Sequence, residues 1–167
     1  MSDLYTELLV KKEKTAKDSL TKIGLIALVV VLAFAGLFIH PLLLIGAVAA
    51  GVAAYFIIPR TDLEFEYLFV NGEMDIDKIM SKSKRKRVLS FNLSEADIAA
   101  PVKSHRMDYY NGNQKMKVLD FSSGNSDHNR MAVIARVNNE ACRIILEPDE
   151  TLAKAMKNSA PSKVFLD

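Results

Sequence analysis

The most prominent pattern in the chain is an apolar stretch from Ile23 to Ile58 that contains no charged residue. As one helix this stretch would be about 54 Å long, nearly twice the ~30 Å of a bilayer's hydrocarbon core. Pro41 lacks a backbone N–H and disfavours helical geometry at His40, so we predict two helices, Ile23–Ile39 and Leu42–Ile58. Because lipid offers no partners for free backbone groups, the pattern indicates a transmembrane helical hairpin over residues 23–58.

Hydrophobic and polar residues alternate after Arg60 with the period of two that is typical of strands. Leu63–Val70 and Glu73–Met80 flank Asn71-Gly72, the favoured two-residue hairpin turn, so we predict a β-hairpin there. Further strands are predicted at Val88–Leu93 and Met116–Phe121, and as a second hairpin at Arg130–Val137 and Glu140–Leu146 around Asn138-Asn139. The pattern of Pro148–Asn158 predicts an amphipathic closing helix with a proline in its first turn.

This order of elements predicts an α+β chain in which residues 61–167 form one cytoplasmic β domain. About six strands followed by a helix match a small antiparallel β-barrel or sandwich that a C-terminal helix caps. About 107 residues suffice for one such domain with its own core. The side chains expected in that core are Phe65, Tyr67, Phe69, Met74, Ile76, Leu119, Phe121, Val133, Ile144 and Leu146.

Residues 1–22 carry a different pattern, with apolar side chains first and charged side chains later. The apolar residues cluster at spacings of four, as Leu4 with Leu8 and Tyr5 with Leu9. This spacing predicts an amphipathic juxtamembrane helix that lies at the membrane surface, with Ser2 or Asp3 as its cap. A cytoplasmic extension of the first membrane helix fits the same spacing equally well.

Basic residues flank the apolar stretch on both sides, whereas its turn holds only His40. The flanking residues are Lys11, Lys12, Lys14, Lys17 and Lys22 before the stretch, and Arg60 and the run from Lys82 to Arg87 after it. The positive-inside bias then predicts a cell-membrane protein with two spans, both termini in the cytoplasm and the turn facing outward.

Composition agrees with a membrane anchor joined to a soluble domain. Half of the residues are hydrophobic, yet the mean hydropathy is only +0.10, so the chain outside the apolar stretch is ordinary charged sequence. The single cysteine, Cys142, excludes an internal disulfide framework and a zinc site with several cysteines.

Small residues are concentrated in the second predicted membrane helix, at Gly46, Ala47, Ala50, Gly51 and Ala54. Their spacings of three and four allow a neighbouring helix to approach closely. That neighbour is either the first helix or another membrane protein, including a second copy of the chain. The alternative is that glycine and alanine are simply common in membrane helices.

No catalytic, cofactor or metal motif rises above the background of the sequence. Asp75-Ile76-Asp77 has the form of a metal-binding pair, but alternation on a strand makes the two carboxylates its solvent face. His105, His128 and Cys142 are far apart and lack the spacing of metal ligands. We therefore expect no metal, no cofactor and no enzymatic activity, with a small membrane-bound enzyme of unrecognised site as the alternative.

One feature has a plausible physical role, the basic run made by Lys82, Lys84, Arg85, Lys86 and Arg87. It fits a patch for anionic lipid head groups, a solvated loop, or a contact for a protein or nucleic acid. No aromatic platform interleaves with the run, which disfavours nucleic acid. A hairpin that starts at the bilayer returns there, which favours lipid. We expect a membrane-anchored binding or scaffold module.

The order of these features resembles a family of small, uncharacterised membrane proteins of Gram-positive bacteria, a domain of unknown function. The resemblance covers nearly the whole chain and rests on the membrane hairpin, the strand sequence from Leu63 to Ile79, Lys84–Arg87, Ala100-Pro101-Val102, Glu147-Pro148, Pro161 and Lys163-Val164-Phe165. The architecture is also similar to bacterial pleckstrin-homology-like membrane proteins, which implies a seven-strand, one-helix barrel. Neither resemblance implies catalytic residues.

Overall fold

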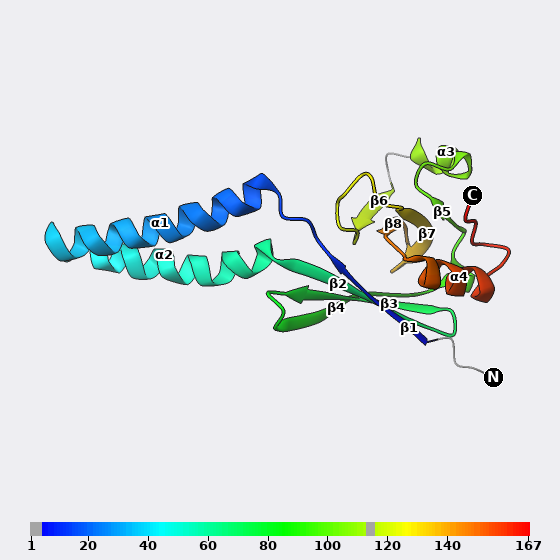
Figure 1. Cartoon of the computed structure of the whole chain (residues 1–167), viewed down its shortest axis with the longest axis horizontal. Coiled ribbons are helices and arrows are strands. Elements are labelled where there is room, and N and C mark those ends of the chain that lie inside the picture. The colour runs from blue at the N-terminus through cyan, green and yellow to red at the C-terminus, as the bar shows by residue number, and fades with distance from the viewer. Residues whose placement is uncertain (1–4, 113–115) are drawn as a thin grey trace. The chain divides into compact units, whose positions relative to one another are not determined.

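A computed structural model describes residues 5–112 and 116–167 of the chain (Figure 1). These residues form two compact units. The helical unit comprises residues 13–63 and 80–84, and the β unit comprises residues 5–12, 64–79 and 85–167. The β unit thus differs from the predicted domain of residues 61–167, because it includes residues 5–12 and leaves residues 80–84 to the helical unit.

The helical unit is a pair of antiparallel helices, α1 (Ala16–Phe38) and α2 (Leu43–Ile57), as Figure 1 shows. The predicted break at His40-Pro41 is confirmed, and a 3₁₀ turn at Ile58–Thr61 follows α2. Thr15 caps α1 in a capping box with Asp18. The helical segments Ala16–Phe38 and Leu43–Thr61 are long and apolar enough to cross a membrane, which suggests membrane association.

Small residues let α2 pack closely against α1. Ala47 and Ala54, seven residues apart on α2, are buried, and Gly36 of α1 lies against Leu44 so tightly that a Cβ would come within 2.7 Å of its side chain. For Ala47 and Ala54, the predicted neighbouring helix is therefore α1. A second copy of the chain as a further neighbour stays a prediction.

The first sheet contains four strands in the order β1-β2-β3-β4. These strands are β1 (Tyr5–Lys11), β2 (Leu63–Val70), β3 (Glu73–Met80) and β4 (Lys84–Asn92). The predicted hairpin of β2 and β3 is confirmed to the residue, and its turn has positive φ at Asn71 and Gly72, 50° and 93°. Asparagine and glycine tolerate such angles, which explains the turn sequence.

The helix predicted over residues 1–22 is wrong in its first half. Residues Tyr5–Lys11 form β1, which pairs antiparallel with β2 from Tyr5 opposite Val70 to Lys11 opposite Glu64. A spacing of four is a multiple of two, so the apolar pairs of this segment fit a strand as well as a helix. Ser2 and Asp3, the expected caps, lie outside the described residues.

The second sheet has the order β5-β7-β8-β6. Its strands are β5 (Ile98–Pro101), β6 (Lys117–Asp120), β7 (Met131–Val137) and β8 (Glu140–Leu146). The predicted hairpin about Asn138-Asn139 is confirmed, whereas β6 pairs parallel with β8 instead of antiparallel. Short elements connect the strands at Leu93–Glu95, His105–Met107 and α3 (Asp108–Asn111).

The core of the β unit lies between the two sheets and helix α4 (Glu150–Ser159). All ten predicted core residues belong to it, with Leu119 and Phe121 only partly buried. The described strands form two open four-stranded sheets, so the closed-barrel form of the prediction is wrong and the sandwich form is the nearer one. Within residues 5–112 and 116–167 the structure has eight strands, because β1 and β5 add to the six predicted.

Candidate functional site

The basic run begins in a turn and continues as a strand. The expected loop ends early, because Lys84 to Arg87 already belong to β4, and the strand predicted to start at Val88 starts four residues sooner. These first residues of β4 are exposed, and its buried side chains are Leu89 and Phe91. Charged residues can form a strand here because β4 is a sheet edge and lies beside carboxylates of β3.

Arg85 and Arg87 bind carboxylates of the first sheet. The Arg85 Nε atom lies 2.6 Å from Asp77 Oδ2, and its guanidinium also pairs with Glu66 of β2. The Arg87 guanidinium lies 2.9 Å from Asp75 Oδ2 and 3.6 Å from Asp77 Oδ1. Two of the five basic residues predicted to meet a lipid surface therefore have partners inside the β unit.

The sequence predicted that Asp75 and Asp77 form the solvent face of their strand, but Asp77 is buried and Asp75 is half-buried. Glu66 and Asp77 are only 7% and 6% exposed. Burial raises the pKa of Glu66, against the lowering effect of Arg85, and the neighbouring carboxyls of Glu7 and Asp77 raise it further. The pKa of Arg85 is raised by its hydrogen bond to Asp77. The arginines thus hold β4 to a group of buried carboxylates.

The turn before β4 has an unusual backbone. Ser81 and Lys82 have φ of 47° and 56°. In the other two hairpin turns of the described chain, asparagine or glycine occupies the positions with positive φ. A serine and a lysine in this left-handed region cost about 1–2 kcal/mol each. The Ser81 N–H donates to the Asp62 carbonyl at 2.9 Å, which fixes the turn beside the segment that follows α2.

Basic side chains gather at the open end of the helical hairpin, where α1 begins and α2 ends. We call them the basic collar: Lys14, Lys17, Lys22, Arg60, Lys82 and Lys84. The Lys84 Nζ atom lies 5.3 Å from the centroid of the Tyr55 ring, and Lys14 lies 3.2 Å from Asp62. The other end of the hairpin carries only His40 and Pro41 between apolar residues. The hairpin therefore has one basic and one apolar end.

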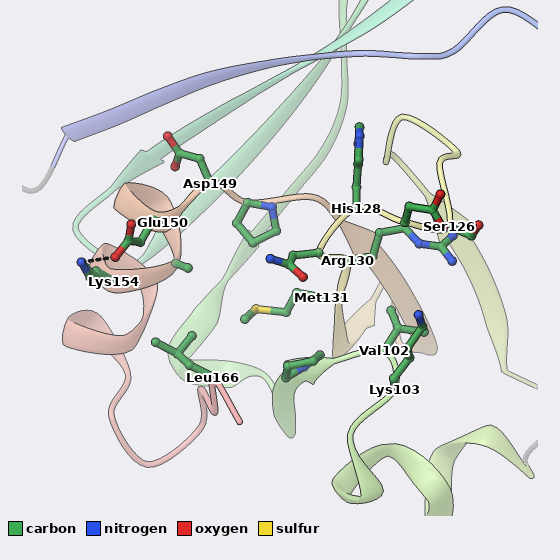
Figure 2. A pocket seen from close by; sticks show the side chains of 15 residues that line it. Val102, Lys103, Ser126, His128, Arg130, Met131, Asp149, Glu150, Lys154 and Leu166 are labelled. Atoms are coloured by element: carbon green, nitrogen blue, oxygen red, sulfur yellow. Dashed lines mark hydrogen bonds and ion pairs between the residues drawn. The ribbon is translucent and has the colours of Figure 1, made fainter.

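A pocket of about 560 Å³ opens in the β unit (Figure 2). Met131 and Leu166 give it apolar walls, whereas Lys103 lies toward one side and Asp149 of the segment before α4 toward the other. Glu150 lies at the same side and bonds to Lys154 at 2.6 Å. The lining comes from four separate segments of the chain, so no local sequence pattern could predict the pocket.

His128 at the pocket belongs to a cluster with Ser123 and Glu147. Its Nδ1 atom lies 2.6 Å from Glu147 Oε1 and 3.3 Å from Ser123 Oγ. A serine, histidine and acid relay needs the serine and the acid on opposite ring nitrogens. Here both approach the same nitrogen, and Ser123 is only 4% exposed.

The cluster instead fastens the loop between β6 and β7. The Ser123 N–H donates to Glu147 Oε2 at 2.9 Å. Burial would raise the pKa of Glu147, but the hydrogen bonds from Ser123 and His128 outweigh it, so the pKa is lowered. The other two predicted candidates lie elsewhere, since His105 pairs with Asp108 and Cys142 is buried in the core. No metal-binding group of three ligands occurs within the described residues.

The fold defines an α+β protein with an apolar helical hairpin, two four-stranded sheets and a C-terminal helix. The family model of a bacterial PH-like domain (DUF6106) matches residues 2–166. The chain belongs to this family, whose function is unknown, and the resemblance inferred from the sequence is confirmed. No curated protein and no solved structure matches the chain.

Proposed function

We propose that this protein is a membrane-anchored cytoplasmic binding module that contacts anionic lipid head groups beside its own helical hairpin. A PH-like domain fits a binding or scaffold role in general. The lipid contact is the more specific part of the proposal. A neighbouring membrane protein is the other partner that a basic surface of this kind would suit.

The anchoring part rests on the two apolar helices and on the charges at their ends. Only 6% and 11% of the two spans are buried inside the protein, so both helices expose apolar side chains that lipid or another apolar surface would cover. The basic collar lies at the end of the hairpin where the chain continues into the β unit. The positive-inside bias then puts the collar, both termini and the β unit in the cytoplasm.

The observation that carries the lipid contact is the pairing of Lys84 with Tyr55 next to the strained turn at Lys82. Tyrosine is enriched at the level of lipid head groups, and Tyr55 is 64% exposed. A lysine held at a costly backbone angle is more readily explained by a function than by folding. Each basic residue near an anionic surface contributes about 1 kcal/mol, screened by salt.

The ion pairs of Arg85 and Arg87 narrow the set of basic residues that could contact lipid head groups. Arg85 and Arg87 are engaged with buried carboxylates, so they mainly hold β4 in place. Lys82, Lys84 and Lys86 are exposed and form no ion pair within the described chain. We assign the head-group contact to the basic collar, which includes Lys82 and Lys84, and to Lys86, which follows them in the run.

The test uses the full chain, because β1 precedes the hairpin and belongs to the β unit. The protein is reconstituted with equal phosphatidylglycerol and phosphatidylcholine, and the lipids that it retains in detergent are counted by native mass spectrometry. Replacing Lys82, Lys84 and Lys86 with glutamine should weaken the preference for phosphatidylglycerol at least tenfold, or about 1.4 kcal/mol.

The matched control removes three lysines of the β unit outside the run, Lys117, Lys154 and Lys163, also by glutamine. It should keep the preference, because the net charge falls equally while the collar remains. If both triple variants retain the anionic lipid as the parent does, the lipid contact is wrong. If only an associated protein is lost from the first variant, a protein partner replaces lipid in the proposal.

A further inference from the structure

The turn that joins α1 and α2 is apolar on its outside. Leu37, Phe38, Ile39 and Leu42 are between 69% and 80% exposed, more than most other side chains of the helices. Between Ile23 and Ile58 the turn offers no charged residue and no serine, asparagine or glycine near the proline. A turn that emerges into water usually carries such polar residues.

The backbone of this turn needs no water for its N–H groups. The N–H groups of Ile39 and His40 both donate to the Ala35 carbonyl, and those of Leu43, Leu44 and Ile45 donate to carbonyls three residues back. The Leu42 N–H donates to the His40 Nδ1 atom at 3.2 Å. Because Pro41 has no N–H, every donor from residue 39 to residue 45 is paired within the protein.

The segments Ala16–Phe38 and Leu43–Thr61 are long enough to cross a membrane when their charged ends are included, but their uncharged parts are shorter. From Ile23 to Phe38 and from Leu42 to Ile58 the chain rises about 24–26 Å, against ~30 Å for the hydrocarbon core. The first uncharged segment begins directly after Lys22, and the second ends just before Arg60, both of the basic collar. With the collar at one surface, the turn falls several ångströms short of the other, and any tilt shortens the reach further.

We infer that the turn stays inside the apolar layer and contacts the acyl chains of the far leaflet. The chain would then enter and leave the bilayer through its cytoplasmic face alone. This inference rests on the proposed anchoring and changes one expectation from the sequence, the outward-facing turn. The charge bias fixes the side of the two ends, whereas the length and hydrogen bonds of the turn decide whether it emerges.

His40 has a specific role in this arrangement. Its Nδ1 atom accepts the Leu42 N–H, which lies next to the proline and has no carbonyl partner in the turn. The ring can accept at Nδ1 only without a proton on that nitrogen. His40 thus serves as a cap that satisfies the turn where water is excluded.

The chain contains no tryptophan, so single tryptophans report depth directly. Phe38→Trp tests the turn, and Leu20→Trp is the control at the collar, where the side chain is 72% exposed. In reconstituted full-length protein, we expect Phe38→Trp to emit at short wavelength, to be quenched by lipids brominated along their acyl chains, and to be several-fold less sensitive to aqueous iodide than the control.

Ile39→Cys gives the second measurement, in a Cys142→Ala background, because the Ile39 side chain is 78% exposed and takes no part in the hydrogen bonds of the turn. We expect a membrane-impermeant maleimide to leave it unlabelled in intact cells and in inverted vesicles, and to label it after solubilisation in denaturing detergent. Labelling in intact cells, or iodide quenching of Phe38→Trp equal to that of the control, overturns the buried turn and leaves the anchoring intact. Absence of bromolipid quenching, with release by alkaline carbonate, overturns both.

Discussion

The N–H of Ser81 donates a hydrogen bond of 2.9 Å to the carbonyl of Asp62, so the turn between β3 and β4 is fixed to the segment that follows α2. Asp62 also pairs with Lys14, which precedes α1. Three segments far apart in the sequence thus meet at the open end of the helical hairpin. The basic collar is therefore a feature of the folded helical unit and not of one basic run.

Replacing Ser81-Lys82 with Asn-Gly should separate stability from lipid contact. Asparagine and glycine accept positive φ, so the free energy of unfolding should rise by about 1 kcal/mol, while loss of Lys82 should weaken phosphatidylglycerol retention. Thermal unfolding in detergent and native mass spectrometry measure the two effects. Lys82→Gln is the control, with weaker retention and no gain in stability. A less stable Asn-Gly variant would contradict the strained turn.

Tyr67 joins the two sheets through its hydroxyl group. It donates to the Phe121 carbonyl at 2.7 Å and accepts the Glu147 N–H at 3.3 Å, and burial raises its pKa above the usual value. Tyr67→Phe should lower the free energy of unfolding by about 2 kcal/mol, because two backbone groups lose their partner. Denaturation by heat in detergent checks this value, with Tyr109→Phe as an exposed control that should be neutral.

Glu66 should make the stability of the β unit depend on pH. Because its pKa is higher in the folded chain than its ordinary value, the unfolded chain releases this proton first as pH rises. Folding stability attributable to Glu66 is thus present below the ordinary value near 4.5 and is lost as pH rises through the folded value.

The measurement for Glu66 is a series of unfolding midpoints from pH 4 to pH 8, for the parent and for Glu66→Gln. The parent should lose stability relative to the variant as pH rises, because only the parent must ionise a buried carboxyl. The lowered pKa values of Glu147 and Glu150 act in the opposite direction but are common to both proteins. Parallel pH profiles would show that Glu66 ionises without cost in the folded chain.

Local patterns in the sequence predicted the elements with strong turn or breaker signals. Asn71-Gly72 and Asn138-Asn139 located two hairpins, and Pro41 located the break between α1 and α2. Alternation also predicted the core, since every second residue of β2 and β3 faces inward. These features depend on neighbouring residues, which is why the sequence alone suffices for them.

The remaining features depend on partners distant in the sequence. The segment from Tyr5 to Lys11 is a strand because β2 offers an edge more than fifty residues later, and nothing local separates that outcome from a helix. Likewise, the arginines of the basic run belong to a strand because they form ion pairs with buried carboxylates of β2 and β3. The pocket and the Ser123, His128 and Glu147 cluster could not be predicted for the same reason.

The central claim is that the basic collar and the β unit lie at the cytoplasmic face of the cell membrane. A cysteine at Asp167, in a background where the buried Cys142 is alanine, tests it most directly with a membrane-impermeant maleimide. The account predicts labelling in inverted membrane vesicles and none in intact cells, because the collar holds both ends of the hairpin inside. Labelling in intact cells but not in inverted vesicles would contradict it.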